Sequence, residues 1–298
     1  MSEPRFGRVL TAMATPFFED GSLNFDAARE LAQFLVAQGS EGLVVAGSTG
    51  EGSSLSDDEK LDLFACVAEA TTVPVLAGST FANTQSSVAL TTQVKATGVA
   101  GVLATTPAYA RPNQAGIAGH LGAIADSTPL EVMLYDVPSR TGRKIASATT
   151  IDLVRTHKNI VAMKDASGDT ASAAHTKLVL SEGFDLYSGD DGVILPFMGV
   201  GAVGIVSVAA HWAGPEVAAL VHAAAAGDWP LARRFNERAR ESFAFENSDA
   251  YPNPMPTKAA LRALGLAVGE CRLPHGPSDA ALDAEAHRVV AALQATRG

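Results

Sequence analysis

The stretch Ile160-Val161-Ala162-Met163-Lys164 is an apolar run that leads directly into a lysine. A short run of this kind predicts a β-strand that is buried on both faces. Segments with the periodicity of helices separate it from other such runs. Seven further segments have the same strand-like character: Val9–Thr15, Gly42–Gly47, Pro74–Ser79, Gly101–Pro107, Glu131–Val137, Asp185–Gly189 and Ala202–Val208.

Eight strand candidates, mostly about 25 to 32 residues apart, predict a (β/α)8 TIM barrel rather than a doubly wound sheet. We expect this barrel in residues 1–227, with only a short helix in the interval Asp190–Gly199. The strand signal ends near Trp229. Residues 228–298 are therefore expected to form a small C-terminal helical domain. Its predicted helices are Trp229–Phe245, Thr257–Leu266 and Ser278–Ala295.

Two helix boundaries have specific signals. Ser56 and Glu59 have the spacing of a capping box, which predicts that a helix begins after Ser56. Gly39 follows a segment with Ala28, Leu31 and Leu35 on one face. A glycine at that place predicts the end of the helix.

The composition argues against several classes of protein. The 298-residue chain has a formal net charge of −10, whereas nucleic acids and anionic membranes are bound by basic surfaces. No apolar stretch approaches the roughly 20 residues that span a bilayer, and the first residues do not resemble a signal peptide. The two cysteines, Cys66 and Cys271, are predicted to be reduced thiols in the cytoplasm. The seven histidines have no spacing typical of metal ligands, so no metal is expected.

Function in a barrel of this kind lies at the carboxyl ends of the strands. Lys164 ends the sixth predicted strand, and burial there would favour the neutral amine over the ammonium. A neutral amine can attack a keto carbonyl and form a Schiff base, which makes bond formation at the neighbouring carbon possible. On spacing alone, a lysine that caps the strand and reaches solvent or Asp165 is the commoner case.

Other polar residues fall on the same predicted rim. Tyr135 ends the fifth strand and could relay protons to an iminium, although alone it is better explained as a core aromatic. The turn Gly47-Ser48-Thr49-Gly50-Glu51 could bring backbone N–H groups to a carboxylate, or it could be an ordinary βα turn. Arg140 could bind a second carboxylate, or it could be a solvated loop cation.

One motif points to a different class of protein. Gly199-Val200-Gly201-Ala202-Val203-Gly204 fits the glycine pattern of dinucleotide-binding proteins. Here the glycines precede a strand instead of opening a helix, and no acidic residue follows about 20 residues on. We interpret them as close backbone packing in the barrel wall, and we expect no nucleotide cofactor.

Five motifs, in order at the strand ends, together resemble the dihydrodipicolinate synthase / N-acetylneuraminate lyase family of class I pyruvate-dependent aldolases. The resemblance covers nearly the whole chain, from Gly7 to the C-terminal helices. It implies a TIM barrel, Schiff-base chemistry and no metal or organic cofactor. The motifs are Gly47–Glu51, Tyr109 with Arg111-Pro112, Tyr135–Gly142, Lys164–Asp169 and Gly189-Asp190-Asp191.

The resemblance also implies roles for individual residues. Lys164 matches the Schiff-base lysine, Tyr135 the tyrosine that assists proton transfer, and Thr49 the hydroxyl of the relay. Tyr109 matches a residue that reaches into the neighbouring subunit, which implies a homo-oligomer, by family habit a tetramer of two dimers. The remaining expected substrate contacts are the backbone amides of Ser48 and Thr49, the Arg140 guanidinium, Gly189 and the Val206 carbonyl.

Arg140 also favours one reaction within the family. The stretch Val137–Gly142 is similar to that of the synthases, which implies condensation of pyruvate with L-aspartate 4-semialdehyde to 4-hydroxy-tetrahydrodipicolinate. Ser48 is common in the lyases, and Asp136 replaces a frequent asparagine. An aldolase of a sugar acid such as N-acetylneuraminate or 2-keto-3-deoxygluconate is therefore the alternative. A barrel that only binds a keto acid, without catalysis, is a third possibility.

Three positions bear on regulation. The lysine-feedback site of regulated synthases uses a tyrosine, a glutamate and often a histidine, where this chain has Ala108, Ser87 and Lys60. We therefore expect weak or absent inhibition by L-lysine.

Overall fold

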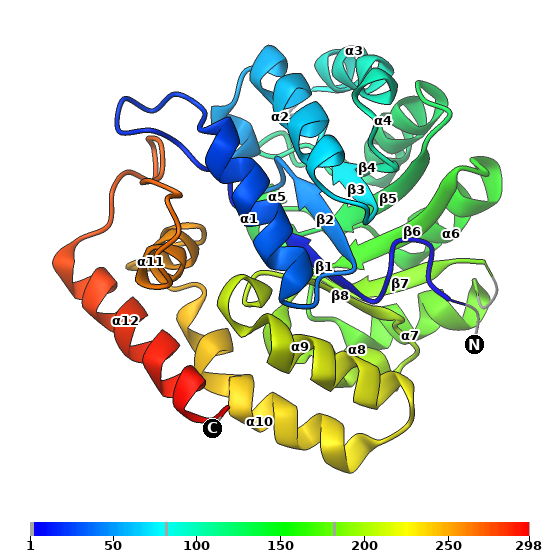
Figure 1. The fold of residues 1–298 in the computed structure, drawn as a ribbon. Coiled ribbons are helices and arrows are strands. Elements are labelled where there is room, and N and C mark those ends of the chain that lie inside the picture. The colour runs from blue at the N-terminus through cyan, green and yellow to red at the C-terminus, as the bar shows by residue number, and fades with distance from the viewer. Residues whose placement is uncertain (1–2, 81–82, 181–182, 298) are drawn as a thin grey trace.

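The computed structural model describes residues 3–80, 83–180 and 183–297 of the chain. Its strands form a closed parallel barrel in the order in which they occur in the sequence, and helices surround this barrel (Figure 1). The (β/α)8 prediction is confirmed, and each of the eight predicted strands is present, most of them slightly shorter than predicted. The strands are β1 (Val9–Ala12), β2 (Gly42–Val45), β3 (Val75–Ala77), β4 (Gly101–Thr105), β5 (Glu131–Asp136), β6 (Ile160–Asp165), β7 (Asp185–Ser188) and β8 (Gly204–Ser207).

The strands are apolar throughout because both of their faces are buried. One set of side chains, including Leu10, Leu76, Met133 and Val206, packs together inside the barrel. The alternate set, which includes Val45, packs outward against the helices. This division follows from the alternation of side chains along a strand.

The helices around the barrel begin and end at the predicted signals where these exist. Ser56 Oγ accepts from the Glu59 amide at 3.2 Å, and Glu59 Oε2 accepts from the Ser56 amide at 2.9 Å, so the capping box is confirmed. The helices of this layer are α1 (Phe25–Ala37), α2 (Asp57–Ala70), α3 (Thr84–Val94), α4 (Gln114–Asp126), α5 (Pro138–Thr141), α6 (Ser147–Thr156), α7 (Thr170–Val179), α8 (Ile194–Gly199) and α9 (Ala210–Ala225).

The glycine motif at 199–204 belongs to the barrel wall. Gly199 ends the short helix α8, and Gly204 begins β8. A Cβ atom on Gly204 would lie 1.8 Å from the carbonyl oxygen of Arg8, so only glycine fits beside the start of β1. The motif therefore allows close strand packing, as its position before a strand predicted.

The C-terminal residues form α10 (Trp229–Phe245), α11 (Met255–Ala263) and α12 (Ala280–Ala295), which lie beside the barrel (Figure 1). The first of these helices has the predicted bounds. The other two are shifted by a few residues at their starts or ends. Ala259 of α11 packs against Leu282 and Ala286 of α12. The expected division between residues 227 and 228 falls between α9 and α10 and stays a prediction.

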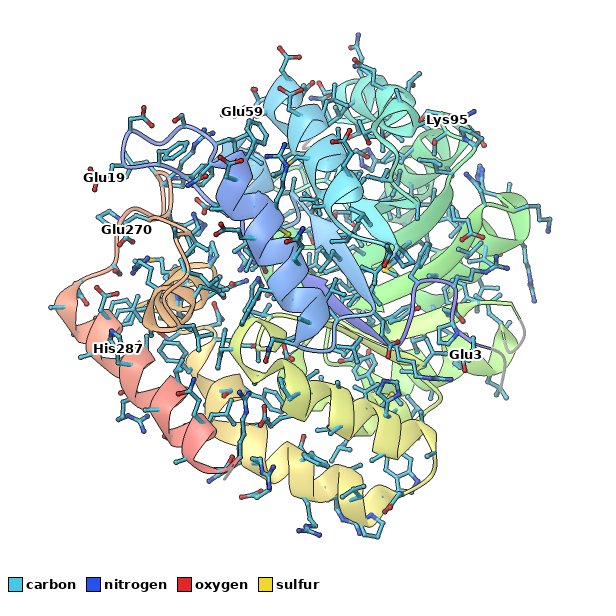
Figure 2. The ribbon with its side chains drawn as sticks, in the orientation of Figure 1. Glu3, Glu19, Glu59, Lys95, Glu270 and His287 are labelled. Atoms are coloured by element: carbon cyan, nitrogen blue, oxygen red, sulfur yellow. The ribbon has the colours of Figure 1, made fainter. Side chains whose placement is uncertain are left out.

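An ion pair connects the C-terminal helices to the barrel. Lys258 Nζ of α11 lies 2.7 Å from Glu51 Oε1, and both side chains are buried. Arg272, in the connection between α11 and α12, pairs with Glu59 of α2 and donates to the Ser54 carbonyl at 2.8 Å. Figure 2 shows Glu59 on α2 and Glu270 in the same C-terminal connection. These contacts hold the connection against the residues that follow β2.

No helix in the described residues is both long and apolar enough to cross a membrane.

We predict that Lys258→Met will destabilise the protein strongly, because it leaves the Glu51 carboxylate buried without its cation. Removal of one partner of a buried pair costs about 3–5 kcal/mol. The free energy of unfolding from urea titration measures the effect. Arg288→Ala is the control, because Arg288 pairs with two half-exposed acids, Glu241 and Glu285. Equal losses in the two variants would contradict the prediction.

Candidate active site

Lys164 and Tyr135 lie side by side near the carboxyl ends of β6 and β5. Their Cα atoms are register partners in the parallel ladder. Lys164 Nζ lies 4.4 Å from the centroid of the Tyr135 ring. Both residues are buried, at 4% and 5% exposure. The sequence placed these two residues on neighbouring strands, and the barrel brings the amine against the aromatic ring.

Tyr187 on β7 is also a register partner of Lys164, but its hydroxyl points away from the carboxyl ends of the strands. This hydroxyl donates to the carbonyl of Gly7, which precedes β1, at 2.9 Å. Burial raises the pKa of the Tyr187 phenol well above its ordinary value. Tyr187 is therefore a structural donor, and Tyr135 is the tyrosine whose ring meets the amine.

The turn after β2 is closed by backbone hydrogen bonds. The Glu51 amide donates to the Ser48 carbonyl at 3.1 Å, and Glu51 has a φ of 52°. A Cβ atom on Gly52 would lie 2.0 Å from the Ala46 carbonyl oxygen, so the turn requires glycine there. Within the described residues, neither the Ser48 amide nor the Thr49 amide donates to another residue. These amides have the chemistry that a carboxylate needs.

Thr49 contacts a residue that the sequence did not single out. Asn253 Nδ2 donates to Thr49 Oγ1 at 2.9 Å, and these residues are 204 positions apart. The Arg140 guanidinium, in α5, donates to the carbonyl of Asn253 at 3.2 Å. Asn253 lies in the proline-rich connection between α10 and α11, where composition gives no signal of a site residue.

A cavity of about 450 Å³ opens over the carboxyl ends of the strands, from β2 to β5. Two predicted residues, Ser48 and Arg140, line it together with Thr105 and Val137. His275, from the connection before α12, also lines this cavity and was not expected from the sequence. Burial lowers the pKa of His275 below its ordinary value, which favours the neutral imidazole. A cavity of this size admits small acids of the kind that the motifs predict.

Tyr109 is not brought to Lys164 within one chain. Its side chain is 97% exposed, and its φ is 67°. The loop around it is attached to α5, because Arg111 Nε donates to the Gly142 carbonyl at 3.0 Å. The loop therefore holds the Tyr109 phenol outward into solvent.

Gly189 and Val206 lie at the opposite side of the barrel. The Gly189 amide donates to the Asp165 carbonyl at 2.7 Å, and a Cβ atom on Gly189 would lie 2.8 Å from Ala166 Cβ. Glycine thus lets the end of β7 approach β6 closely. Val206 belongs to the same interior cluster as Tyr135.

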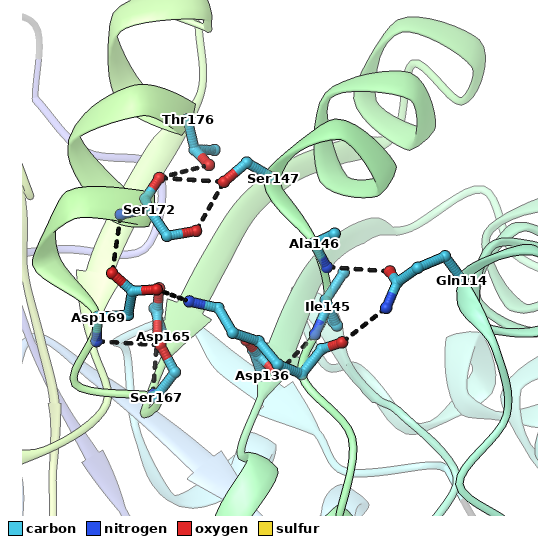
Figure 3. Close-up of polar contacts among 11 residues, drawn as sticks. Gln114, Asp136, Ile145, Ala146, Ser147, Asp165, Ser167, Asp169, Ser172 and Thr176 are labelled. Atoms are coloured by element: carbon cyan, nitrogen blue, oxygen red, sulfur yellow. Dashed lines mark hydrogen bonds and ion pairs between the residues drawn. The ribbon is translucent and has the colours of Figure 1, made fainter.

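Two buried acids, Asp136 and Asp165, directly follow Tyr135 and Lys164 at the ends of β5 and β6. Burial raises the pKa of Asp136 to about 7, and Asp136 Oδ1 accepts from the Ile145 amide at 3.1 Å. Burial also raises the pKa of Asp165, which accepts from the Ser167 amide. Figure 3 shows these contacts, which connect β5 and β6 with the starts of α6 and α7.

Glu246 is a further acid, half-buried in the structure, that the sequence did not indicate. Its Oε2 atom is enclosed and has no hydrogen-bond partner in the described residues. Burial and the nearby Asp191 raise the pKa of this carboxyl well above its ordinary value. Asp191 is fixed by Ser207 and by the Val208 amide, which donates at 2.8 Å. The motif Gly189-Asp190-Asp191 thus contributes a buried carboxylate to the end of β7.

The described residues contain no group of three histidine, cysteine or acidic side chains placed to hold a metal ion.

Comparison with known proteins agrees with this geometry. The model of the dihydrodipicolinate synthetase family matches residues 5–293. The chain is 44% identical to the 4-hydroxy-tetrahydrodipicolinate synthase of Moorella thermoacetica, over 98% of this chain and 99% of that one. The chain belongs to the dihydrodipicolinate synthetase family. This confirms the prediction of an enzyme, a lyase of the 4-hydroxy-tetrahydrodipicolinate synthase type.

Solved structures give the same result. The dihydrodipicolinate synthase of Bacillus anthracis matches with a TM-score of 0.92 and 38% identity, over 96% of this chain and 98% of that one. The enzyme of Cyanidioschyzon merolae, solved with lysine bound, matches with a TM-score of 0.93 and 37% identity, over 97% and 98%.

We predict that Asp136→Asn will stabilise the protein above pH 7 and much less near pH 4. The carboxyl has an ordinary pKa of 3.8 and a pKa of about 7 in the folded protein. The unfolded chain releases this proton first, so stability falls as pH rises through that window. Asparagine removes that loss, and we expect a gain on the order of 2 kcal/mol at pH 8.

Melting temperatures at pH 4, 6 and 8 measure this effect. Asp169→Asn is the control with the opposite sign, because the hydrogen bond from Lys144 lowers the pKa of Asp169. Its stabilising contribution is present at neutral pH and is lost as pH falls. A gain for Asp136→Asn that is equal at pH 4 and pH 8 would disprove the assignment.

Proposed function

We propose that this enzyme condenses pyruvate with L-aspartate 4-semialdehyde and that Lys164 is its nucleophile. One observation carries the proposal: the only buried amine on the β6 rim lies against the ring of Tyr135, within the described residues. Membership of the dihydrodipicolinate synthetase family supports it. A lysine amine can form an iminium with a keto acid, so the protein itself supplies the electron sink.

In the proposed reaction, the Lys164 amine attacks the keto carbon of pyruvate and water leaves. Loss of a methyl proton turns the iminium into an enamine, whose carbon attacks the aldehyde of the second substrate. Tyr135 and the Thr49 hydroxyl carry the protons that these steps release and consume. The Ser48 and Thr49 amides bind the pyruvate carboxylate. The amino group of the semialdehyde then displaces Lys164, closes the ring and frees the enzyme.

Arg140 indicates the chemistry of the second substrate. Its guanidinium lines the same cavity as Ser48, where it can donate two hydrogen bonds to a carboxylate. L-Aspartate 4-semialdehyde carries such a carboxylate beside its amine. Gly189 and the Val206 carbonyl are proposed to complete the pocket on the other side.

We further propose that Tyr109 acts in a partner subunit. A phenol that is 97% exposed on a loop with a positive φ is presented outward, as a residue that crosses a dimer interface must be. A homotetramer made of two such dimers is the proposed assembly. A cytoplasmic location is proposed because Cys66 and Cys271 are both free thiols.

Reduction with borohydride in the presence of pyruvate tests the nucleophile. We expect one reduced pyruvate adduct per chain, mapped to the peptide that contains Lys164, and none in Lys164→Ala. A side-by-side assay with aspartate semialdehyde, N-acetylneuraminate and 2-keto-3-deoxygluconate tests the substrate. Turnover of a sugar acid in place of the semialdehyde would sink the synthase assignment. A wild-type enzyme without any adduct would support a barrel that only binds keto acids.

We predict that L-lysine inhibits the enzyme weakly or not at all. Ala108 lines the cavity with a methyl group only, so it offers no phenol to a bound lysine. Lys60 is buried, and burial lowers its pKa to about 8. An amine there repels a cationic ligand when it is charged. Initial rates at increasing lysine measure the effect, and inhibition at sub-millimolar lysine would overturn the prediction.

A further inference from the structure

Asn253 joins the C-terminal helices to the active-site turn through its side chain. Its Nδ2 donates to Thr49 Oγ1 at 2.9 Å, and its Oδ1 accepts from Thr257 Oγ1 at 3.1 Å. The three side chains are buried, with exposures of 7% for Asn253, 2% for Thr49 and 0% for Thr257. Both ends of the amide are therefore used inside the protein.

These two hydrogen bonds determine which group the hydroxyl proton of Thr49 can be donated to. A threonine hydroxyl has one proton to donate and two lone pairs to accept with. Since Thr49 Oγ1 accepts from the Asn253 amide, its own proton stays available for another acceptor. The opposite rotamer of the amide would present its oxygen to Thr49 and would take that proton. In the structure the amide nitrogen faces Thr49 and the amide oxygen accepts from Thr257.

We propose that Asn253 is a positioning residue of the aldolase reaction, whose side-chain amide holds the Thr49 hydroxyl so that its proton is directed to the relay with Tyr135. This inference rests on the proposed function, because it assigns a role to the proposed proton relay. The C-terminal helices thereby take part in proton transfer without contacting the substrate.

The backbone of Asn253 has a separate contact that makes the proposal testable. Its carbonyl accepts from Arg140, and its amide donates to Asn247 Oδ1 at 3.0 Å. Both contacts survive a change of the side chain. Side-chain variants of Asn253 should therefore affect the steps that use Thr49 and leave binding of the aldehyde by Arg140 nearly unchanged.

The first experiment compares Asn253→Ala, Thr257→Val and Asn247→Ala with the wild type. Exchange of the pyruvate methyl protons for deuterium, followed by NMR without aldehyde, isolates enamine formation. We expect Asn253→Ala to lower this exchange rate and kcat by roughly 10- to 100-fold, with the aldehyde KM within about threefold. Thr257→Val should give a smaller loss of the same kind, because the side-chain amide of Asn253 then lacks the hydrogen bond from Thr257. Asn247→Ala should stay within about threefold of the wild type in every parameter.

The second experiment uses Asn253→Asp and the pH dependence of kcat. An ionised carboxylate can only accept hydrogen bonds, so the Thr49 hydroxyl would donate to it and no longer to the relay. The neutral acid can donate to Thr49 Oγ1 as the amide does. We therefore expect the deficit relative to the wild type to shrink as pH falls. The deficit of Asn253→Ala should stay constant over the same range, since alanine does not titrate.

The outcomes separate the two proposals. A wild type that forms no pyruvate adduct and exchanges no methyl protons would overturn the proposed function itself. A competent wild type with an unimpaired Asn253→Ala would overturn only the role of Asn253. Equal losses in Asn247→Ala and Asn253→Ala would also overturn it, because loop geometry would then explain the effect. If Asn253→Ala fails to fold, the pH dependence of Asn253→Asp decides, and a constant deficit counts against the proposal.

Discussion

Glu51 and Lys258 neutralise each other where water does not reach, and this pair fixes how the end of the chain meets the barrel. The Lys258 ammonium also donates to the Glu270 carbonyl at 2.8 Å and lies 4.1 Å from the centroid of the Phe17 ring. Burial lowers the pKa of Lys258, while the Glu51 carboxylate opposes that shift. Because a lone buried charge is so unfavourable, the ion pair holds the turn after β2 against the start of α11. That turn carries Thr49, so the geometry of the site depends on a contact outside the barrel.

The site therefore has two parts with different origins. Lys164 and Tyr135 are placed by strand register, which leaves little freedom once the barrel has closed. Thr49 and Arg140 lie on a turn and on a short helix after a strand, and both contact Asn253. Loop residues need such external support to reach the precision that catalysis demands. The strands thus place Lys164, the proposed nucleophile, and the C-terminal connection supports Thr49 and Arg140.

The sequence indicated the residues of both parts, but it did not indicate the Asn253 contacts that support the second part. Buried parallel strands are uniformly apolar, so all eight were visible, and with them the positions of Lys164 and Tyr135 at strand ends. The capping box at Ser56 fixed the start of α2 through local hydrogen bonds. Asn253, His275 and Glu246 were missed because each meets the site only through distant folding, from segments whose composition is ordinary. The raised pKa of Asp136 follows from its enclosure, which no local pattern encodes.

The ion pair of Glu51 with Lys258 also sets an order of events during synthesis. A ribosome releases the chain from its N-terminus, so all eight strands emerge before α11 does. Until then the Glu51 carboxylate lacks the Lys258 ammonium as its partner and must remain hydrated. The strands of the nascent barrel can pair before the C-terminal helices are made. The contact between α11 and the turn after β2 can form only when the final helices leave the ribosome. A chain that stops before Lys258 would thus contain Lys164 and Tyr135, yet lack the contact between α11 and the turn after β2.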